Sequence, residues 1–134
     1  MIELSEEQYE QIMEHGRREW PLEACGLLAG EEPGVILSVW PLENEWKARN
    51  RFFVSAKVVA QTLEHVSHAG HKVLAIYHTH PDTAPYPSYT DLLHHPDDNV
   101  IMVILSYKTN PPNMRCFTIK NRTCDEHPFS IKKR

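Results

Sequence analysis

The sequence of 134 residues lacks the features that mark several specialised classes of protein. Basic residues are not in excess, because 14 lysines and arginines stand against 18 aspartates and glutamates. This balance argues against nucleic acid or an anionic membrane as the main partner. No apolar run approaches the roughly 18 residues of a membrane-spanning helix, and the N-terminus has no secretory signal. We therefore expect a cytoplasmic protein.

Cysteine is scarce, and signs of a second domain are missing. Cys25, Cys116 and Cys124 form an odd set with no CxxC pair, which fits a reducing compartment better than a disulfide framework. The chain has no internal repeat, low-complexity tract or linker, and its length suits about one domain. We predict a single domain over residues 1–134, with an oligomeric state that the sequence does not specify.

The sequence does contain a regular alternation of helical and strand-like patterns. Hydrophobic periodicity predicts helices at residues 5–20 and 55–69, and a short helix at 88–94. Ser5 and Gln8 form a capping box at the first helix, and Gly70 ends the second. Apolar or β-rich runs predict strands at residues 24–29, 35–42, 51–54, 73–77, 100–107 and 114–120, with an edge strand near Phe129 and Ile131. This alternation predicts an α/β fold, bordering on α+β, with a sheet packed between helices.

The sequence also predicts two loops and the buried faces of the two longer helices. Residues 43–51 are polar and residues 81–87 contain three prolines, so both segments are predicted to be loops. The buried helix faces are expected to include Tyr9, Ile12, Met13 and Trp20 in the first helix, and Val59, Leu63 and Val66 in the second.

The chemistry is concentrated in one short segment, His78-Thr79-His80-Pro81, which is followed by Ser88 and Asp91. The two histidines are two residues apart at the end of a predicted strand, so both side chains leave the same side. Asp91 lies in the first turn of the next predicted helix, and the proline-rich loop can fold it back toward the strand end. Two histidines and one aspartate leave a coordination position open for water, as in catalytic zinc sites. Zinc would lower the pKa of that water toward roughly 7.

Two more residues fit a hydrolytic site. A carboxylate is needed to take the proton of the water, and Glu23 is the candidate, just before the strand predicted at residues 24–29. It lies beside the metal if that strand neighbours residues 73–77. The Ser88 hydroxyl could donate a hydrogen bond to the oxyanion of a tetrahedral intermediate.

Each of these residues also has a simpler interpretation. A chain with nine histidines contains His-x-His pairs by chance, Ser88 and Asp91 form a capping box, and Glu23 alone fits a solvated carboxylate. The complete set, His-x-His-x7-Ser-x2-Asp, arises by chance in only about one in a thousand chains of this composition. The joint pattern therefore favours a metal site.

The remaining histidines are weaker candidates. His65, His68 and His71 surround the end of the second predicted helix, where Gly70 interrupts the turn, and we interpret them as solvated. His94 and His95 follow Asp91 by three and four residues, so His95 is a rival ligand. The H-x-E and P-C-x-x-C ligands of a cytidine deaminase are missing.

The pattern resembles the signature of the JAMM, or MPN-plus, metalloprotease family. That signature is an upstream Glu, then His-Ser/Thr-His-Pro, then Ser-x-x-Asp, and Glu23, His78, His80, Ser88 and Asp91 fill its positions. The stretch PLEACGLLAG at residues 21–30 further resembles the bacterial and archaeal branch, where P-x-E-x-C-G-L-L is usual. The resemblance extends from the first helix to about residue 120.

The resemblance implies a zinc isopeptidase or peptidase that cleaves an amide bond at the C-terminus of ubiquitin or a ubiquitin-like protein. His78, His80 and Asp91 would hold one Zn²⁺ with its catalytic water, Glu23 would be the general acid/base, and Ser88 would support the oxyanion. The implied fold is JAB1/MPN, a curved mixed sheet flanked by helices, similar to the cytidine deaminase architecture.

The substrate expected from the resemblance is the C-terminal tail of a ubiquitin-like sulfur-carrier protein. The chain is close to a bare family core, with only the seven-residue loop 81–87 between the histidine pair and Ser88. Small bacterial members of this kind resemble enzymes that act on such carriers, whose tails commonly end in Gly-Gly. Loop 43–51 and the loop around Tyr86 are the expected walls of a tail groove, and the tail could also add as a strand to a sheet edge.

Two other functions use parts of this pattern. A 2-His-1-carboxylate iron oxygenase needs similar ligands, but its ligands are usually widely separated on an all-β scaffold. A non-catalytic MPN-type scaffold module would have a broken ligand set, and the set here is intact. Metal analysis and substitution of Glu23 separate these alternatives from a zinc isopeptidase.

Overall fold

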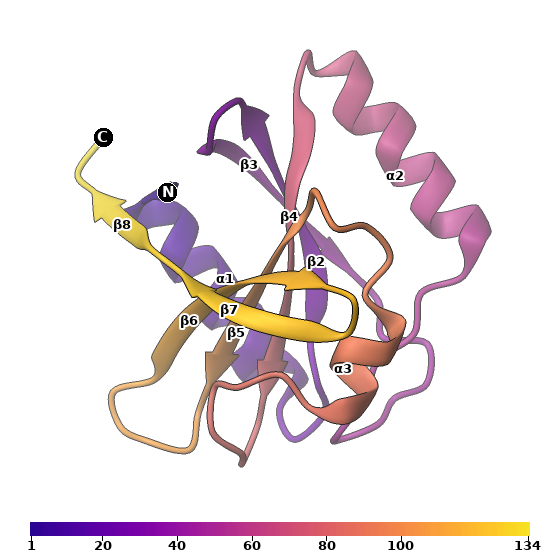
Figure 1. The fold of residues 1–134 in the computed structure, drawn as a ribbon, viewed down its shortest axis with the longest axis vertical. Coiled ribbons are helices and arrows are strands. Elements are labelled where there is room, and N and C mark those ends of the chain that lie inside the picture. Colours follow the sequence, from indigo (N-terminus) through magenta and orange to yellow (C-terminus); the bar gives the residue numbers. More distant parts are fainter.

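A mixed eight-stranded sheet and three helices make up the fold of residues 1–134 in the computed structural model (Figure 1). In chain order the elements are β1 (Ile2–Ser5), α1 (Glu6–Glu19), β2 (Cys25–Glu31), β3 (Val35–Leu42), α2 (Ala56–His68), β4 (Lys72–His80), α3 (Tyr89–His94), β5 (Ile101–Ser106), β6 (Asn113–Lys120), β7 (Thr123–His127) and β8 (Phe129–Lys132). None of the three helices combines the length and the apolar character needed to cross a membrane.

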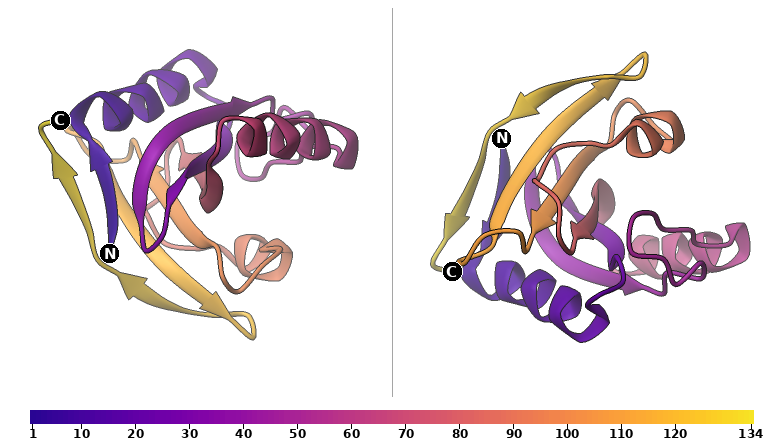
Figure 2. Two further views of the ribbon diagram at one scale, coloured as in Figure 1. Left: turned by 90° about the horizontal axis from the view of Figure 1, so that it is seen from above. Right: turned by 90° about the horizontal axis from the view of Figure 1, so that it is seen from below.

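The strands are ordered β7-β6-β5-β4-β2-β3-β1-β8 across the sheet. The β4–β5, β1–β3 and β1–β8 pairs are parallel, and the other neighbours are antiparallel. The two edge strands, β7 and β8, follow each other directly in the chain, and the sheet curves strongly between them (Figure 2). The predicted α/β class with a curved mixed sheet is thus confirmed.

The sheet has two differently used faces, because side chains alternate along each strand. On one face, Tyr77 of β4 belongs to a core cluster that includes Ile12 of α1. On the other, Ile104 of β5 and Phe117 of β6 belong to a second cluster, against which Leu92 of α3 packs. Figure 2 accordingly places α2 and α3 on one side of the molecule and α1 on the other.

The first helix follows its predicted cap. Ser5 is the N-cap, its amide donates to Gln8 Oε1 at 2.9 Å, and the Gln8 amide donates to Ser5 Oγ at 3.1 Å. Ile12 is buried as predicted, but Trp20 is 52% exposed, because it follows the last helical residue and leaves the buried face. The short strand β1, just before this helix, was not predicted.

The strand predicted at residues 51–54 is wrong. These residues form no ladder, because a side chain takes the place of a partner strand: Asn44 Nδ2 donates to the Arg51 carbonyl at 3.0 Å, and the Phe53 amide donates to Asn44 Oδ1 at 3.2 Å. The segment continues the predicted loop 43–51 up to the Ser55 cap of α2.

The second helix is shorter than predicted by one residue at each end, and Gly70 follows it with a φ of +76° that favours glycine. Its buried stripe is narrower than predicted. Val66 is its only buried residue, whereas Leu63 is 45% exposed, because α2 packs on the sheet mainly along β4.

Candidate metal centre

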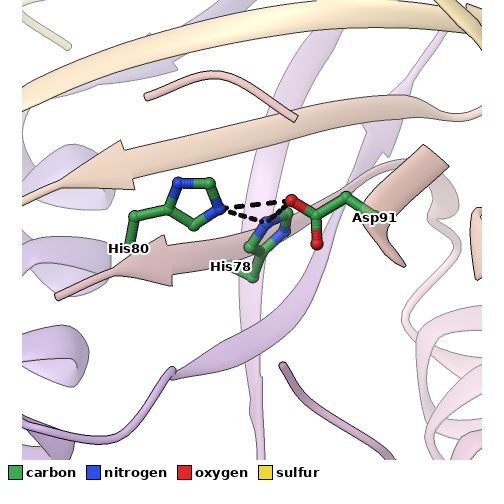
Figure 3. A group of neighbouring side chains, drawn as sticks. All are labelled: His78, His80 and Asp91. Carbon is green, nitrogen blue, oxygen red and sulfur yellow. Dashed lines mark hydrogen bonds and ion pairs between the residues drawn. The ribbon is translucent and has the colours of Figure 1, made fainter. Parts of the chain in front are cut away.

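The end of β4 presents the histidine pair. His78 pairs with Cys25 of β2 on one side and with Ile104 of β5 on the other, so the strand is fixed from both sides. His78 and His80 leave the same side of β4, as their spacing predicts, and both are buried (Figure 3).

The third residue, Asp91, is oriented by the cap of α3. Ser88 is the N-cap: the Asp91 amide donates to Ser88 Oγ at 3.0 Å, and the Ser88 amide donates to Asp91 Oδ2 at 2.9 Å. The same Oδ2 atom faces both histidines (Figure 3). The simple capping-box interpretation is therefore correct, and it is also what aims the carboxylate at the histidine pair.

Three atoms from these residues form a nearly equilateral triangle. The two Nε2 atoms of His78 and His80 are 3.1 Å apart, and Asp91 Oδ2 lies 3.1 Å from the first and 3.2 Å from the second. Tetrahedral ligands at zinc distances of about 2.0–2.1 Å are separated from one another by roughly 3.3 Å. The spacing of the three donor atoms thus fits a small tetrahedral cation.

The position of the proton on the His80 ring also supports a bound cation. Its Nδ1 lies 2.8 Å from the Ala84 carbonyl, which can only accept, so Nδ1 carries a proton and donates. In the neutral ring Nε2 then directs a lone pair at the Asp91 carboxylate, and two acceptors face each other. A cation between them satisfies both, and the Ala84 bond is the outer support typical of a metal-binding histidine.

Asp91 is ionised at this position. Burial by itself favours the neutral acid, but the neighbouring His78 and the hydrogen bond from the Ser88 amide outweigh it. Together they hold the pKa of Asp91 well below its usual range. The donor group therefore carries a buried negative charge, which favours a bound cation.

Glu23 lies beside this group without belonging to it. The Ala24 amide donates to Thr79 Oγ1 at 2.8 Å and the Thr79 amide to the Ala24 carbonyl at 2.9 Å, so continuing the register places Glu23 opposite His80. Glu23 is 3% exposed, and its Oε1 has no hydrogen-bond partner. Burial, followed by the Asp91 charge, raises the pKa of Glu23 to about 9. The donor group of the site contains only His78, His80 and Asp91.

A cavity of about 500 Å³ opens beside the donor group, and His78 and Asp91 form part of its wall. Trp46 and Arg51, at the loop predicted to flank the site, also line it. Tyr86, the other expected wall residue, is not among the lining residues and lies against Phe117 instead, with ring centroids 6.0 Å apart.

The other histidines do not belong to the donor group. His95, the rival ligand, directs Nε2 at the Val100 carbonyl at 2.7 Å and is not part of the donor group. His65 and His68 are exposed as predicted, whereas His71 is half-buried and contacts Ser38 Oγ at 2.9 Å.

Two supporting residues were missed by sequence reasoning. Asn44 donates to the Glu23 carbonyl at 3.0 Å, and the Phe52 ring lies 5.0 Å from that of His78. Asn44 was predicted only as a polar loop residue, and Phe52 only as part of the strand wrongly predicted at residues 51–54.

The chain belongs to the family described as prokaryotic homologs of the JAB domain, which matches residues 5–120. The predicted membership of a small prokaryotic JAMM/MPN family is therefore confirmed. A desampylase from Haloferax volcanii is 28% identical over 96 residues, covering 67% of this chain and 69% of its own. A CysO-cysteine peptidase from Mycobacterium tuberculosis is 28% identical over 129 residues, covering 90% of this chain and 84% of its own.

Solved structures agree on the fold. The solution structure of protein DSY2949 from Desulfitobacterium hafniense has a TM-score of 0.92 and 29% identity, covering 100% of this chain and 94% of that one. A JAB1/MPN domain protein from Archaeoglobus fulgidus, AF2198, has a TM-score of 0.64 and 23% identity, with 98% of both chains covered. The predicted JAB1/MPN fold is therefore confirmed.

Proposed function

We propose that the protein is a zinc-dependent peptidase, acting as a single domain over residues 1–134, that hydrolyses an amide bond at the C-terminus of a ubiquitin-like protein of the sulfur-carrier kind. The observation that carries the proposal is the triangle of His78 Nε2, His80 Nε2 and Asp91 Oδ2, with sides of 3.1–3.2 Å. Its size, burial and charge fit a zinc ion with one position left for water or substrate.

His78, His80 and Asp91 would hold the ion. Bound zinc polarises the scissile carbonyl and supplies a water with a pKa near 7. The Ala84 carbonyl keeps the His80 ring in the tautomer whose Nε2 is free to bind, and the Ser88 amide keeps Asp91 Oδ2 directed at the same point.

Glu23 moves the proton. Burial raises the pKa of Glu23, so its carboxylate is a stronger base than an exposed one. A nearby cation lowers that pKa toward 7, which suits a general base at neutral pH. Glu23 takes a proton from the attacking water and gives it to the leaving nitrogen, so that the amide is replaced by a carboxylate and an amine.

Ser88 is suited to the oxyanion. Its Oγ accepts from the Asp91 amide in the cap, which leaves its one O–H free to donate. We assign that hydrogen bond to the oxygen that becomes negative as the carbonyl is attacked.

The relatives support a peptidase. One is named a desampylase and another a CysO-cysteine peptidase. The resemblance of the sequence to small bacterial members supplies the ubiquitin-like carrier as the substrate class.

Glu23→Gln tests the assignment of the base. The variant should keep about one zinc per chain, because Glu23 is outside the donor group, and hydrolysis of a ubiquitin-like protein with a C-terminal extension should fall at least about 100-fold. Glu64→Gln, an exposed change on α2, is the control and should leave the rate unchanged. Retained hydrolysis by Glu23→Gln would remove Glu23 from this role. Iron bound in place of zinc would favour the oxygenase alternative. A protein that binds no metal would favour the non-catalytic scaffold module.

A further inference from the structure

Strand β3 has a free edge along most of its length. It pairs with β2 from Val35 to Leu42, whereas β1 meets its other side only at the Glu3–Val35 pair. Beyond that pair the chain of β1 turns into α1, and residues 37–42 make no main-chain hydrogen bond to any segment other than β2. Pro41 fits such an edge, because proline has no amide hydrogen to donate. Alternate main-chain groups of residues 37–42 therefore point away from β2 without a partner.

A groove runs between this free edge and α1. It has a volume of about 440 Å³, and Figure 2 shows α1 lying alongside β3. The wall on β3 consists of Val39 and Pro41, and the wall on α1 is the polar stripe Glu7, Glu10, Gln11, Glu14 and Arg18. The stripe rises roughly 16 Å along the helix, and residues 37–42 extend over roughly 20 Å. The groove thus has the length of about five extended residues.

The charges in the groove favour a positively charged ligand. Three of its lining residues, Glu7, Glu10 and Glu14, are acidic, and only Arg18 is basic. Arg17, outside the groove, pairs with Glu10 at 3.1 Å and with Glu14 at 3.6 Å. Glu7 has no ion pair within the chain, so its carboxylate is available to a ligand.

A cation of the chain itself already binds at the start of this edge. Arg134 Nη2 donates to the Ile36 carbonyl at 2.7 Å, and Arg134 Nε lies 3.3 Å from Glu3 Oε2. One guanidinium thus pairs both with a main-chain acceptor of β3 and with a carboxylate next to it. The same combination, a free strand edge beside carboxylates, continues along the groove.

We propose that this groove binds an extended segment of a partner protein, which adds to β3 as a further strand and carries lysine or arginine at alternate positions. Main-chain hydrogen bonds to residues 37–42 supply affinity, and the alternate side chains that face α1 pair with its carboxylates. Alternate side chains of a strand are roughly 7 Å apart, whereas Glu7 and Glu14 are separated by roughly 10 Å along the helix. Two successive long basic side chains therefore reach both carboxylates.

The groove is separate from the candidate metal centre. Val39 packs against the core cluster that contains Tyr77, whereas His78, the next residue of β4, lines the cavity on the opposite face of the sheet. A bound segment leaves that cavity open. The inference therefore does not depend on the proposed function.

Titration of the full chain with the peptide acetyl-Lys-Val-Lys-Val-Lys-Val-amide tests the place and the charge preference of the groove. We expect the amide resonances of residues 37–42 to shift, and the dissociation constant to rise about 3- to 10-fold in Glu7→Lys, because an exposed ion pair is replaced by repulsion. Glu6→Lys is the matched control: it is exposed in the same helical turn, lies outside the groove and should bind as the wild type does. Unmoved resonances of residues 37–42 at millimolar peptide, or equal dissociation constants for the two variants, would overturn the proposal.

Methylation of the peptide nitrogens tests strand addition without changing the protein. In an extended peptide the N–H groups of the three lysines point to one edge, and those of the three valines point to the other. Only one of these edges faces β3. One of the two methylated peptides should therefore bind at least about tenfold more weakly than the other, because it has lost its hydrogen bonds to the strand. Equal binding of the two methylated peptides would overturn strand addition.

Analytical ultracentrifugation of the wild type, with and without the peptide, tests a second copy of the chain as the occupant. We expect no self-association that the peptide reverses. A dimer that dissociates when the peptide is added would assign the groove to a second copy and would overturn the partner protein.

Discussion

His78 and His80 have similar positions relative to Asp91 but different supports. The ring of His80 is held by the Ala84 carbonyl, whereas Nδ1 of His78 is buried with no hydrogen-bond partner. The Phe52 ring lies over His78, with centroids 5.0 Å apart and planes inclined by 31°. Packing against Phe52 thus takes the place of the outer hydrogen bond that usually orients a metal-binding histidine.

Phe52→Ala should therefore weaken metal binding. We expect the zinc affinity to fall about tenfold, as for other losses of an outer support, when measured by competition with a chromophoric chelator. Phe53→Ala is the matched control, because that ring is exposed and stacks on Trp46 instead of on His78. Equal affinities of the wild type and Phe52→Ala would contradict this role.

A second residue-scale prediction concerns His15, on the opposite face of the sheet. His15 is buried, its Nδ1 lies 2.7 Å from the Tyr77 hydroxyl, and burial lowers its pKa below the ordinary 6.5. Below about pH 6.5 the unfolded chain then binds a proton that the folded chain does not. The free energy of unfolding must therefore fall as the pH decreases through this range.

His15→Gln should remove this part of the pH dependence. Relative to the wild type, its free energy of unfolding should change less between pH 7 and pH 5, by at most about 1.4 kcal/mol per pH unit. Urea unfolding across that range measures the difference. His68→Gln, an exposed change on α2, should keep the wild-type slope. The same slope in His15→Gln would show that His15 is not responsible.

At the residue scale, the sequence predicts the candidate metal-donor side chains better than the residues that orient them. His78, His80, Ser88 and Asp91 form a local pattern whose chemistry depends on residue type and spacing. Phe52 acts only through a contact in space, which arises once its loop has folded, and no spacing rule reveals it.

Among the elements, the segment 43–55 between β3 and α2 connects the proposed base, the cavity and the proposed metal centre. Asn44 organises it: Nδ2 donates to the carbonyls of Glu23 and Arg51, and Oδ1 accepts from the amides of Trp46 and Phe53 at 3.2 Å each. Nδ2 also lies 3.4 Å from the Ala48 carbonyl, so one side chain hydrogen-bonds to five main-chain groups where there is no regular ladder.

Asn44→Ala should destabilise the protein, because it leaves several of these groups without partners. We expect the free energy of unfolding to fall by about 1–3 kcal/mol in chemical denaturation. Asn50→Ala, an exposed change in the same segment, is the control and should cost less than about 0.5 kcal/mol. An Asn44→Ala variant as stable as the control would show that the segment does not depend on this network.

Helices and strands with a clear hydrophobic pattern were predicted well, and those without one were missed. The strand at residues 35–42 was predicted with its observed bounds, and the cap of α1 was predicted to the residue. β7 was missed, because its sequence TCDEH is polar and it pairs with β6 through the main chain. Gly26 was noted as part of a motif, and the structure explains it, since a Cβ there would collide with the Tyr77 ring.

At the scale of the whole molecule, the site depends on strand order. Glu23 precedes β2, the histidine pair ends β4, and Asp91 comes from α3 after the loop 81–87. Antiparallel pairing of β2 with β4 is what brings Glu23 beside the histidines. The sequence predicted this placement only on the condition that the two strands are neighbours, because strand order depends on packing between distant segments.

The most direct test of the proposed metal centre is the zinc content of the purified protein, measured by mass spectrometry for the wild type and for His78→Ala. We predict about one zinc per chain in the wild type and its loss in the variant, because His78 supplies one of three converging donors. A wild-type protein that contains no zinc when freshly purified, and takes up none on reconstitution, would contradict the proposed metal centre.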